Sequence, residues 1–366
     1  MFLSKMLLVA SIMQGAAKFI MGGHRLLPLL AVFLFAASAA VRAETDTAGD
    51  QDQSWVAYLD RVAQEAIREG VSPATIETAF NSLEPDERVI GFDRRQPEFV
   101  QTFEEYLAAR VTDFRQREGR RLYREHQALL QEIGAAYGVD PEYIVAFWGL
   151  ETSFGRYQGK YSIIRSLATL GFDQRRSAFF TAELTKALHI LDEGHVAPDQ
   201  FVGAWAGAMG QGQFMPSSFL RFAVDYDGDG RKDIWSNQAD VFASIANYLK
   251  QAGWKSGAGW GTRVNYDASL QPGDLKPETR DTTCRALKHH TKQLPLSDWR
   301  NLGVSWEQAP GVGDDNSLWA LIVPDGDQTN SYLVGGNFRT ILRYNCANKY
   351  AVSVGLLAEA ITQESS

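Results

Sequence analysis

Apolar residues recur every three or four positions from Ser54 to about Leu130, and this spacing predicts helices. The clearest run consists of Trp55, Tyr58, Leu59, Val62, Ala66 and Ile67. Ser72-Pro73 then supplies the N-cap and first-turn residues of a further helix. We expect two long amphipathic helices to follow, over Gln96–Arg117 and Arg120–Tyr137, with Gly138 ending the second.

The pattern changes after Trp254. Residues from about 262 to 340 contain short apolar or alternating runs, such as Leu318–Val323, which predict strands. From Phe338 to about Ile361 the helical spacing returns. We therefore expect a mainly α (α+β) protein, with a helix-rich body and a small β-containing insert.

The first 43 residues have the pattern of an export signal. Met21–Ala43 has a basic start, an apolar middle and small residues ending in Val41-Arg42-Ala43, which is typical of a cleaved secretory signal. Residues 1–20 read as an upstream start or a long leader. We expect a soluble periplasmic protein, with an uncleaved N-terminal anchor as the alternative. The segment has no cysteine near its cleavage site, which disfavours a lipid anchor.

Composition narrows the class of protein. The 366 residues are 45% hydrophobic and 22% charged, which excludes disordered and multi-span membrane classes. The formal net charge is −8, and residues 1–43 hold four basic residues and no acid, so the remainder carries −12. Such an acidic chain argues against a nucleic-acid partner. The two cysteines, Cys284 and Cys346, are equally compatible with one disulfide or two buried thiols.

One predicted helix contains a single acid in an apolar setting. We expect Asp140 to cap a helix and Pro141 to take its first position. The positions after them are apolar nearly all round, so this helix is expected to be buried. Glu151 lies at its C-terminal end, where desolvation and the helix dipole both raise the pKa of a carboxyl group. A general acid needs such a raised pKa near neutral pH. The alternative is a structural ion pair with a nearby arginine: Arg156, Arg165, Arg175 or Arg176.

Residues 203–218, GAWAGAMGQGQFMPSS, combine small residues with two glutamines. Small residues allow a backbone to approach a ligand closely, and Gln213 and Phe214 add an amide and a ring. The alternative is a tight helix-packing stretch. The chain has no nucleophile elbow, C-x-x-C, H-E-x-x-H or phosphate-binding loop, so we expect no organic cofactor.

An acidic loop follows that resembles an EF-hand calcium loop. Acids occupy its first, third, fifth and ninth positions, with a glycine at the sixth. The expected ligands are Asp225, Asp227, Asp229, the backbone carbonyl of Arg231, and Asp233, with Asp240 as a replacement for the missing twelfth-position glutamate. We expect a structural calcium ion, and the alternative is an acidic turn that caps the next helix.

Five separated segments resemble one family when they are taken in order. They are GLETSFG, the Arg175-Arg176 pair, GAMGQGQFMPSS, the DxDGDGxxDxW loop and RYNxxxxYA. Together they resemble the lytic murein transglycosylase B family, over the chain from about Trp55 to the C-terminus. The resemblance implies a lysozyme-like catalytic core at residues 139–261, after an N-terminal helical domain at 44–138. It places the β-containing insert at 262–340 and a C-terminal helix that returns to the groove at 341–366.

The resemblance also implies an enzyme and its site. Such an enzyme cleaves peptidoglycan between N-acetylmuramic acid and N-acetylglucosamine and leaves a 1,6-anhydromuramyl end. Glu151 matches the single catalytic acid/base, and the acidic loop matches the calcium site. The matching substrate-binding residues are Tyr106, Arg175, Arg176, Gln213, Phe214, Tyr248, Tyr344, Asn345 and Tyr350, with the arginine pair facing the peptide stem. Ala204 stands where some members have a serine that helps to orient the reaction.

Three other functions compete with this interpretation. A hydrolytic muramidase uses a second acid and water, whereas a transglycosylase uses the O6 hydroxyl of the sugar itself. A non-catalytic peptidoglycan-binding scaffold needs Glu151 only for structure. A calcium sensor is weaker, because one loop without the twelfth-position glutamate makes a poor switch. We expect a monomer that binds glycan strands, with proteins of wall synthesis or division as a further class of partner.

Overall fold

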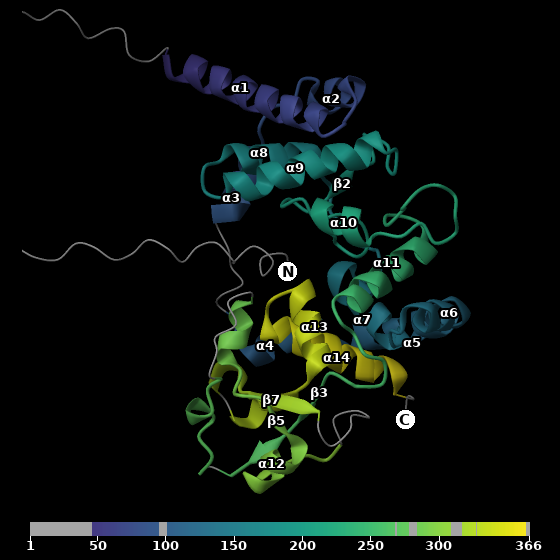
Figure 1. The fold of residues 1–366 in the computed structure, drawn as a ribbon, viewed down its shortest axis with the longest axis vertical. Helices are drawn as coiled ribbons and strands as arrows, with labels where there is room; N and C mark the ends of the chain where they lie inside the picture. Colours follow the sequence, from purple (N-terminus) through teal and green to yellow (C-terminus); the bar gives the residue numbers. More distant parts are fainter. Residues whose placement is uncertain are drawn as a thin grey trace, which may run out of the picture.

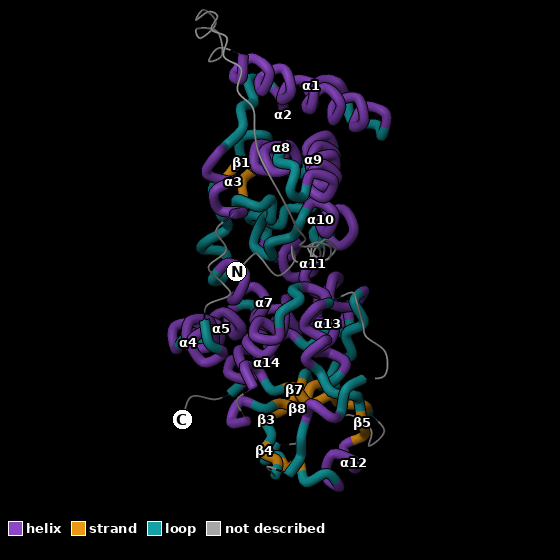
Figure 2. Tube along the Cα trace, turned by 90° about the vertical axis from the view of Figure 1, so that its left-hand side faces the viewer, coloured by secondary structure: helices purple, strands orange, loops and turns teal. Residues whose placement is uncertain are grey.

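The computed structural model describes residues 46–94, 101–267, 269–277, 284–308, 317–326 and 328–363. Helices make up most of this part of the chain, and the strands from β3 onward gather at one end of an elongated molecule (Figures 1 and 2). The predicted export signal lies outside the described residues. Within them, no helix combines the length and apolar character needed to cross a membrane.

Three helices at the start of the chain pack on a later helical pair. They are α1 (Asp46–Arg68), α2 (Pro73–Phe80) and α3 (Glu87–Arg94), and they contact α8 (Ile163–Phe172) and α9 (Ser177–Asp192) (Figure 1). The predicted start of α2 is confirmed, because the Ser72 hydroxyl accepts a hydrogen bond from the Thr75 N–H.

The region from 101 to 137 forms three helices: α4 (Phe103–Arg110), α5 (Asp113–Glu125) and α6 (Gln127–Tyr137). The prediction of two long helices here is wrong. The Thr112 hydroxyl accepts the Arg115 N–H and begins α5, which breaks the first predicted helix. The second is interrupted at His126, where the backbone leaves the helical conformation. Gly138 ends α6 in the left-handed conformation, as predicted.

These helices surround a buried one. Every residue of α7 (Pro141–Thr152) from Tyr143 onward is buried, which confirms the prediction from its apolar sequence. Around it pack α5, α6, α11 (Gln238–Gln251) and α14 (Asn348–Thr362). The smaller elements α10 (Pro216–Phe222), β1 (Tyr161–Ser162) and β2 (Val202–Gly203) complete this body, in which β1 and β2 pair antiparallel. One continuous apolar core extends from Trp55 to Ile361.

The last predicted helix is in fact two helices, α13 (Gly336–Tyr344) and α14. Asn345 adopts an extended conformation and ends α13, and the Ala347 N–H returns to the Asn345 carbonyl at 2.8 Å. The prediction of one helix over 338–361 is therefore wrong at this point. The resulting turn directs α14 back against α7.

The strands between the two helical parts form a four-stranded antiparallel sheet in the order β3 (Gly261–Arg263), β8 (Tyr332–Val334), β7 (Leu318–Ile322) and β5 (Leu294–Pro295). Val334 pairs with both Gly261 and Ala320, which sets the register. A small β4 (Asn265–Tyr266) and β6 (Val304–Ser305) pair lies beside α12 (Leu296–Asn301). The predicted strands are thus confirmed.

The insert has a core of its own. Its centre consists of six buried residues that are separate from the main core: Val264, Trp299, Val304, Trp319, Leu321 and Leu333. It is joined to the helical body by a disulfide between Cys284 and Cys346, so the sequence alternative of two thiols is wrong. Cys346 lies in the turn between α13 and α14.

Candidate active site

Glu151 lies in the last turn of α7, and only 6% of its surface is exposed. The helix begins at Pro141, as predicted, but the Asp140 side chain makes no capping hydrogen bond, so that prediction is wrong. Its carboxylate instead accepts hydrogen bonds from the Trp254 indole at 3.0 Å and the Ser256 hydroxyl at 2.5 Å. The start of the helix is therefore held, and Glu151 lies on a regular buried helix rather than on a loop.

The helix ends sharply just after Glu151. Ser153, Phe154 and Gly155 all have positive φ, and the Ser153 N–H bonds back to the Gly149 carbonyl. Gly155 is required here for two reasons. Its φ of 79° favours glycine, and an added Cβ would lie 2.4 Å from the Gln211 amide oxygen. The turn thus explains the last glycine of the GLETSFG sequence.

The Tyr350 hydroxyl donates a hydrogen bond of 2.7 Å to Glu151 Oε1. Tyr350 is itself buried on α14. Burial, followed by the charge of Glu151, raises the pKa of Tyr350 well above its usual value. The phenol therefore stays protonated and remains a donor to the carboxylate. Tyr106 on α4 also lies close enough to add to this rise in the pKa of Tyr350.

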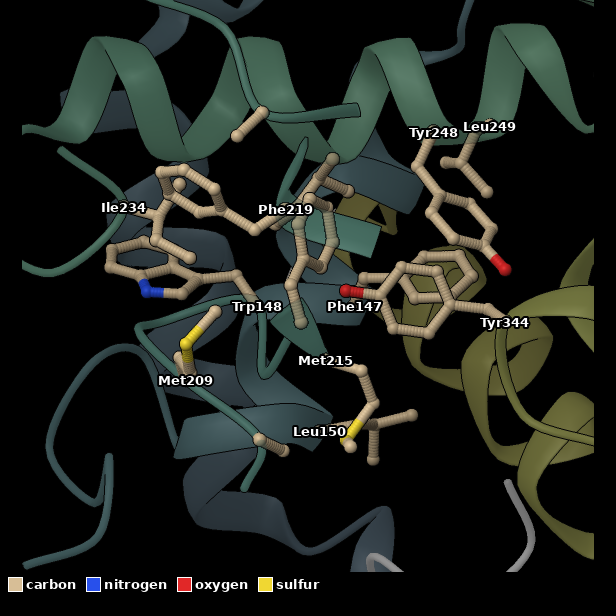
Figure 3. Close-up of a cluster of buried hydrophobic side chains, with 14 of the residues drawn as sticks. Phe147, Trp148, Leu150, Met209, Met215, Phe219, Ile234, Tyr248, Leu249 and Tyr344 are labelled. Carbon is tan, nitrogen blue, oxygen red and sulfur yellow. The ribbon is translucent and has the colours of Figure 1, made fainter. Parts of the chain in front are cut away.

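Aromatic rings line the region beside Glu151. The Tyr344 ring lies 4.6 Å from Phe147, 4.5 Å from Tyr248 and 5.9 Å from Phe214, measured between ring centroids. Figure 3 shows Phe147, Tyr248 and Tyr344 converging from α7, α11 and α13. Burial is the main cause that raises the pKa of both Tyr248 and Tyr344, and the charge of Glu151 adds to each. The structure thus brings four of the predicted substrate-binding residues together, counting Phe214 and Tyr350.

The hydroxyls of this ring cluster hold the site together. Tyr344 donates to the Gly212 carbonyl, and Tyr248 donates to the Arg343 carbonyl at 2.7 Å. Asn345, also predicted to bind substrate, is buried directly after Tyr344. These contacts connect the 203–218 segment with the turn between α13 and α14.

The two glutamines of the 203–218 segment have hydrogen-bond partners within the protein. The Gln213 amide donates to the Gln158 and Gly210 carbonyls at 3.1 and 2.7 Å. The Gln211 amide donates to the Trp235 carbonyl and accepts from the Trp148 indole. Gly210 fits closely as well, because an added Cβ would lie 2.6 Å from Ile234. These contacts give the motif a packing role, and substrate binding by Gln213 and Phe214 stays a prediction.

The paired arginines contact a buried acid. Arg175 Nε donates to Asp93 Oδ2 at 2.7 Å, and Arg176 also forms an ion pair with Asp93. Asp93 is at the end of α3 and was not singled out by any sequence signal, because its partners are over eighty positions away. Arg175 keeps 48% of its side chain exposed, against 11% for Arg176. Burial lowers the pKa of Arg176 to about 10. The expected contact of this pair with a peptide stem is thus open only to the exposed part of Arg175.

The arginines proposed as structural partners of Glu151 have other roles. Arg156 pairs with Glu118, and Arg165 donates to the carbonyls of Glu84 and Pro85. The other buried acids of the described residues are also engaged elsewhere. Glu183 accepts the Ser217 N–H at 2.8 Å, and Asp86 pairs with Arg88. Glu151 is therefore the buried acid that the aromatic cluster surrounds.

Three carboxylates meet in the acidic loop. Oxygen atoms of Asp225, Asp227 and Asp229 all lie within 4.8 Å of one another. Asp225 also accepts the N–H groups of Gly228 and Gly230, at 2.8 and 2.9 Å, which shapes the loop around it. Clustered carboxylate oxygens are the ligands that Ca²⁺ prefers, so the donor set fits this ion.

Asp233 and Asp240 have backbone partners in this loop. Asp233 accepts the N–H groups of Trp235 and Ser236. Asp240 is fully buried and accepts the Tyr226 and Asp233 N–H groups, both at 2.7 Å. Asp240 thus joins the two ends of the loop, and its role as a replacement for the twelfth-position ligand stays a prediction. Arg231 donates its N–H to Asp229 at 2.8 Å.

Known proteins with a similar sequence indicate the family of this chain. Residues 52–359 match the family model described as the transglycosylase SLT domain. The chain is 36% identical over 241 residues to membrane-bound lytic murein transglycosylase B of Escherichia coli. That alignment covers 65% of this chain and 62% of the relative, so it spans less than two thirds of the relative's length.

Solved structures are similar over more of the chain. SltB3 from Pseudomonas aeruginosa, in complex with NAG-anhNAM-pentapeptide, is 38% identical with a TM-score of 0.77, and the match covers 84% of this chain and 80% of that one. The Escherichia coli lytic transglycosylase Slt35, in complex with calcium, is 28% identical with a TM-score of 0.69, covering 83% of this chain and 92% of that one. The expected fold class, a mainly helical protein with a lysozyme-like core, is confirmed.

Proposed function

This chain belongs to the transglycosylase SLT domain family, and on that premise we propose that it is a lytic transglycosylase that cleaves peptidoglycan strands. The observation that carries the proposal is Glu151, a buried acid at the end of α7 with a tyrosine hydroxyl on one of its oxygens. The complex of SltB3 with NAG-anhNAM-pentapeptide supports a substrate of this class.

The reaction needs one acid. Protonated Glu151 donates its proton to the glycosidic oxygen as the bond from that oxygen to C1 of N-acetylmuramic acid breaks. The O6 hydroxyl of the same sugar attacks C1, and the Glu151 carboxylate takes the O6 proton. The products are a 1,6-anhydromuramyl end and a free hydroxyl on the N-acetylglucosamine, with no water consumed. The other buried acids are bound to structural partners, which supports this route over one with a second catalytic acid.

The surrounding residues bind and orient the glycan in this proposal. Tyr106, Gln213, Phe214, Tyr248 and Tyr344 form the walls of the sugar subsites beside Glu151. Tyr350 orients the carboxylate through its hydroxyl. Asn345 holds the N-acetyl group that assists at C1, and Arg175, with its exposed guanidinium, faces the peptide stem.

The proposal also includes a bound calcium ion and a location in the periplasm. The acidic loop binds a structural Ca²⁺ through Asp225, Asp227 and Asp229, which the Slt35 complex with calcium supports. Residues 1–43 direct export to the periplasm, where peptidoglycan lies. We also propose that the chain divides after residues 138, 261 and 340. The separate core of the insert supports treating residues 262–340 as a unit.

Mass spectrometry of the soluble products tests this function. The purified protein is incubated with peptidoglycan sacculi, and anhydromuropeptides are expected. Reducing muropeptides, one water heavier, would instead identify a hydrolytic muramidase. Binding to sacculi without any released product would identify a scaffold.

A further inference from the structure

The first turn of α14 sets the position of the hydroxyl that contacts Glu151. Tyr350 is the third residue of this helix, and its hydroxyl lies 2.7 Å from Glu151 Oε1. A displacement of the turn by roughly 1 Å would lengthen this contact beyond hydrogen-bonding distance. Whatever holds the start of α14 therefore also controls the contact.

This helix start has no side-chain cap of its own. Its N-cap residue is Ala347, which has no polar side chain and makes no capping hydrogen bond. Three of the four residues before Tyr350 are bonded instead to the β-containing insert: Cys346, Asn348 and Lys349.

The first group of bonds comes from residues 284–290 of the insert, here called the strap. Cys284 forms the disulfide with Cys346, and the Ala286 N–H approaches Cys346 Sγ at 3.5 Å. The Asn348 amide donates to the Ala286 carbonyl at 3.3 Å. Asn348 Oδ1 accepts from His290 Nε2 at 2.9 Å. The strap thus contacts residues 346 and 348 through both side-chain and covalent bonds.

The second bond comes from the other side of the same turn. Lys349 Nζ lies 3.0 Å from Asp325 Oδ1 and donates to the Gln101 carbonyl at 2.7 Å. Asp325 also accepts the Phe103 N–H at 2.5 Å. The first turn of α14 is therefore held between the insert and the start of α4.

The end of the strap, at His290, and the next residue, Thr291, are bonded to the sheet of the insert. The Thr291 N–H donates to the Leu321 carbonyl at 3.1 Å, and the Leu321 N–H donates to the Thr291 hydroxyl at 2.8 Å. His290 also forms an isolated bridge with Ile322. Because β7 is an inner strand of the four-stranded sheet, the strap has a rigid base.

We propose that the strap is a positioning element for the reaction: through Cys346 and Asn348 it holds the first turn of α14 so that the Tyr350 hydroxyl stays on Glu151. The inference rests on the proposed role of Glu151. The insert has a small buried core of its own, while the strap packs through Cys284, Ala286 and Leu287 against the main core of the body. The convergence of the strap's bonds on one turn, next to Tyr350, is what a positioning role requires. Cys346 and Asn348 are then positioning residues, which act through Tyr350 and touch no substrate.

The test is a double-mutant cycle in which the reaction rate of each variant is measured as a function of pH. Asn348→Ala keeps the disulfide and loses the side-chain bonds, whereas a Cys284→Ser, Cys346→Ser variant loses the covalent link. Each is made alone and together with Tyr350→Phe, and anhydromuropeptide release is measured against pH. A hydrogen bond to a carboxylate favours its charged form, so loosening it moves the high-pH limb of the rate profile upward.

Each strap variant is expected to lose about tenfold in rate and to show this upward shift. Neither is expected to lose more when Tyr350 is already phenylalanine, because the strap acts through that hydroxyl. The matched control is Gln328→Ala, which removes a hydrogen bond from the exposed Gln328 amide to the Tyr266 carbonyl within the insert. This control should leave the rate and the pH profile unchanged.

Independent losses in the Tyr350→Phe background, or an unmoved high-pH limb, would show that the strap only stabilises the fold. If the cysteine variant does not fold, the Asn348→Ala cycle decides the question. Activity retained by Glu151→Gln would overturn the proposed function instead, whatever the strap variants do.

Discussion

The Tyr350 hydroxyl reaches Glu151 across 199 positions of sequence and donates a hydrogen bond of 2.7 Å to its Oε1. This contact joins α7, the buried helix of the body, to α14, the last helix of the chain. It places a neutral donor beside the carboxylate that the proposed mechanism uses. The buried rings of Tyr344 and Tyr248 lie beside the same region, 4.5 Å apart between centroids.

Replacing Glu151 by Gln should reduce activity by at least about a thousandfold, since general acid and base roles both depend on this one group. The amide is nearly isosteric and retains an acceptor for the Tyr350 hydroxyl. The melting temperature should therefore stay close to that of the wild type. Product release from sacculi and a thermal scan of the same sample check the two expectations. An active variant would refute the assignment of Glu151.

Replacing Tyr350 by Phe should reduce the rate by about tenfold while the protein stays folded, because one hydrogen bond to a charged group is lost without changing the ring. The hydrogen bond favours the charged form of the Glu151 carboxylate, so its loss should raise the pKa of this group. The high-pH limb of the rate profile should therefore move to higher pH. Rates measured from pH 4 to 9 give both quantities. An unchanged profile would mean that this hydroxyl has no influence on the ionisation that limits the rate.

Removing Asp93 should destabilise the protein strongly. Asp93→Asn takes away the charge that pairs with Arg175 and Arg176, and Arg176 is largely buried. Breaking a buried pair in this way lowers the free energy of unfolding by about 3–5 kcal/mol. Asp173→Asn is the control, because its partner Arg94 is mostly exposed, and it should cost at most about 1 kcal/mol. Urea unfolding of both variants measures these changes. Equal losses of unfolding free energy in the two variants would contradict the argument from burial.

Acid should weaken the fold through His290. Burial lowers the pKa of His290 to about 4, with the charges of Arg339 and His289 adding to the effect and the bond to Asn348 opposing it. The unfolded chain takes up a proton near pH 6.5, so stability falls as pH drops from about 6.5 to 4. The full loss from this group is about 3 kcal/mol. His290→Gln, which cannot be charged, should show a flatter dependence of the unfolding free energy on pH. Parallel curves for the two proteins would contradict this assignment.

Calcium should stabilise the acidic loop more than it affects turnover. At a hundredfold excess over its dissociation constant, a bound ion adds roughly 2–3 kcal/mol of stability. Calcium should therefore raise the melting temperature by a few degrees, and chelation should reverse this while leaving most of the activity. Asp227→Ala should abolish the shift, whereas Asp60→Ala, an exposed acid on α1, should keep it. A larger effect on turnover than on melting would instead point to regulation by calcium.

Local sequence patterns predicted which helices and strands are present more accurately than they predicted where each one ends. The apolar α7, the capped start of α2 and the strands at 318–322 follow from spacing and cap residues that lie close together in the chain. The breaks before Asp113 and at His126 were missed because amphipathic spacing continues across them. A side-chain cap or a local change of backbone angle ends a helix there without altering the hydrophobic period.

The roles of polar residues were harder to predict than their presence. The sequence singled out both Gln213 and Asp240 as site residues, yet in the structure their side chains bond to nearby backbone groups. Buried polar groups need partners, and a sequence does not show whether a partner is a ligand or the protein itself. The same reason explains why Asp93, the partner of the arginine pair, could not be found.

By itself the sequence determined a mainly helical chain with a small strand-containing insert, a lone acid in a buried helix and a cluster of carboxylates in one loop. These features depend on residues that are neighbours along the chain, so their physics is local. Only the tertiary structure decided that Tyr350 contacts Glu151 and that Cys284 bonds to Cys346. It also decided that the insert forms hydrogen bonds with the start of α14. Such contacts join segments 60 to 200 positions apart. They form because burying the shared core brings those segments together, and no periodicity in the sequence specifies which distant side chains then meet.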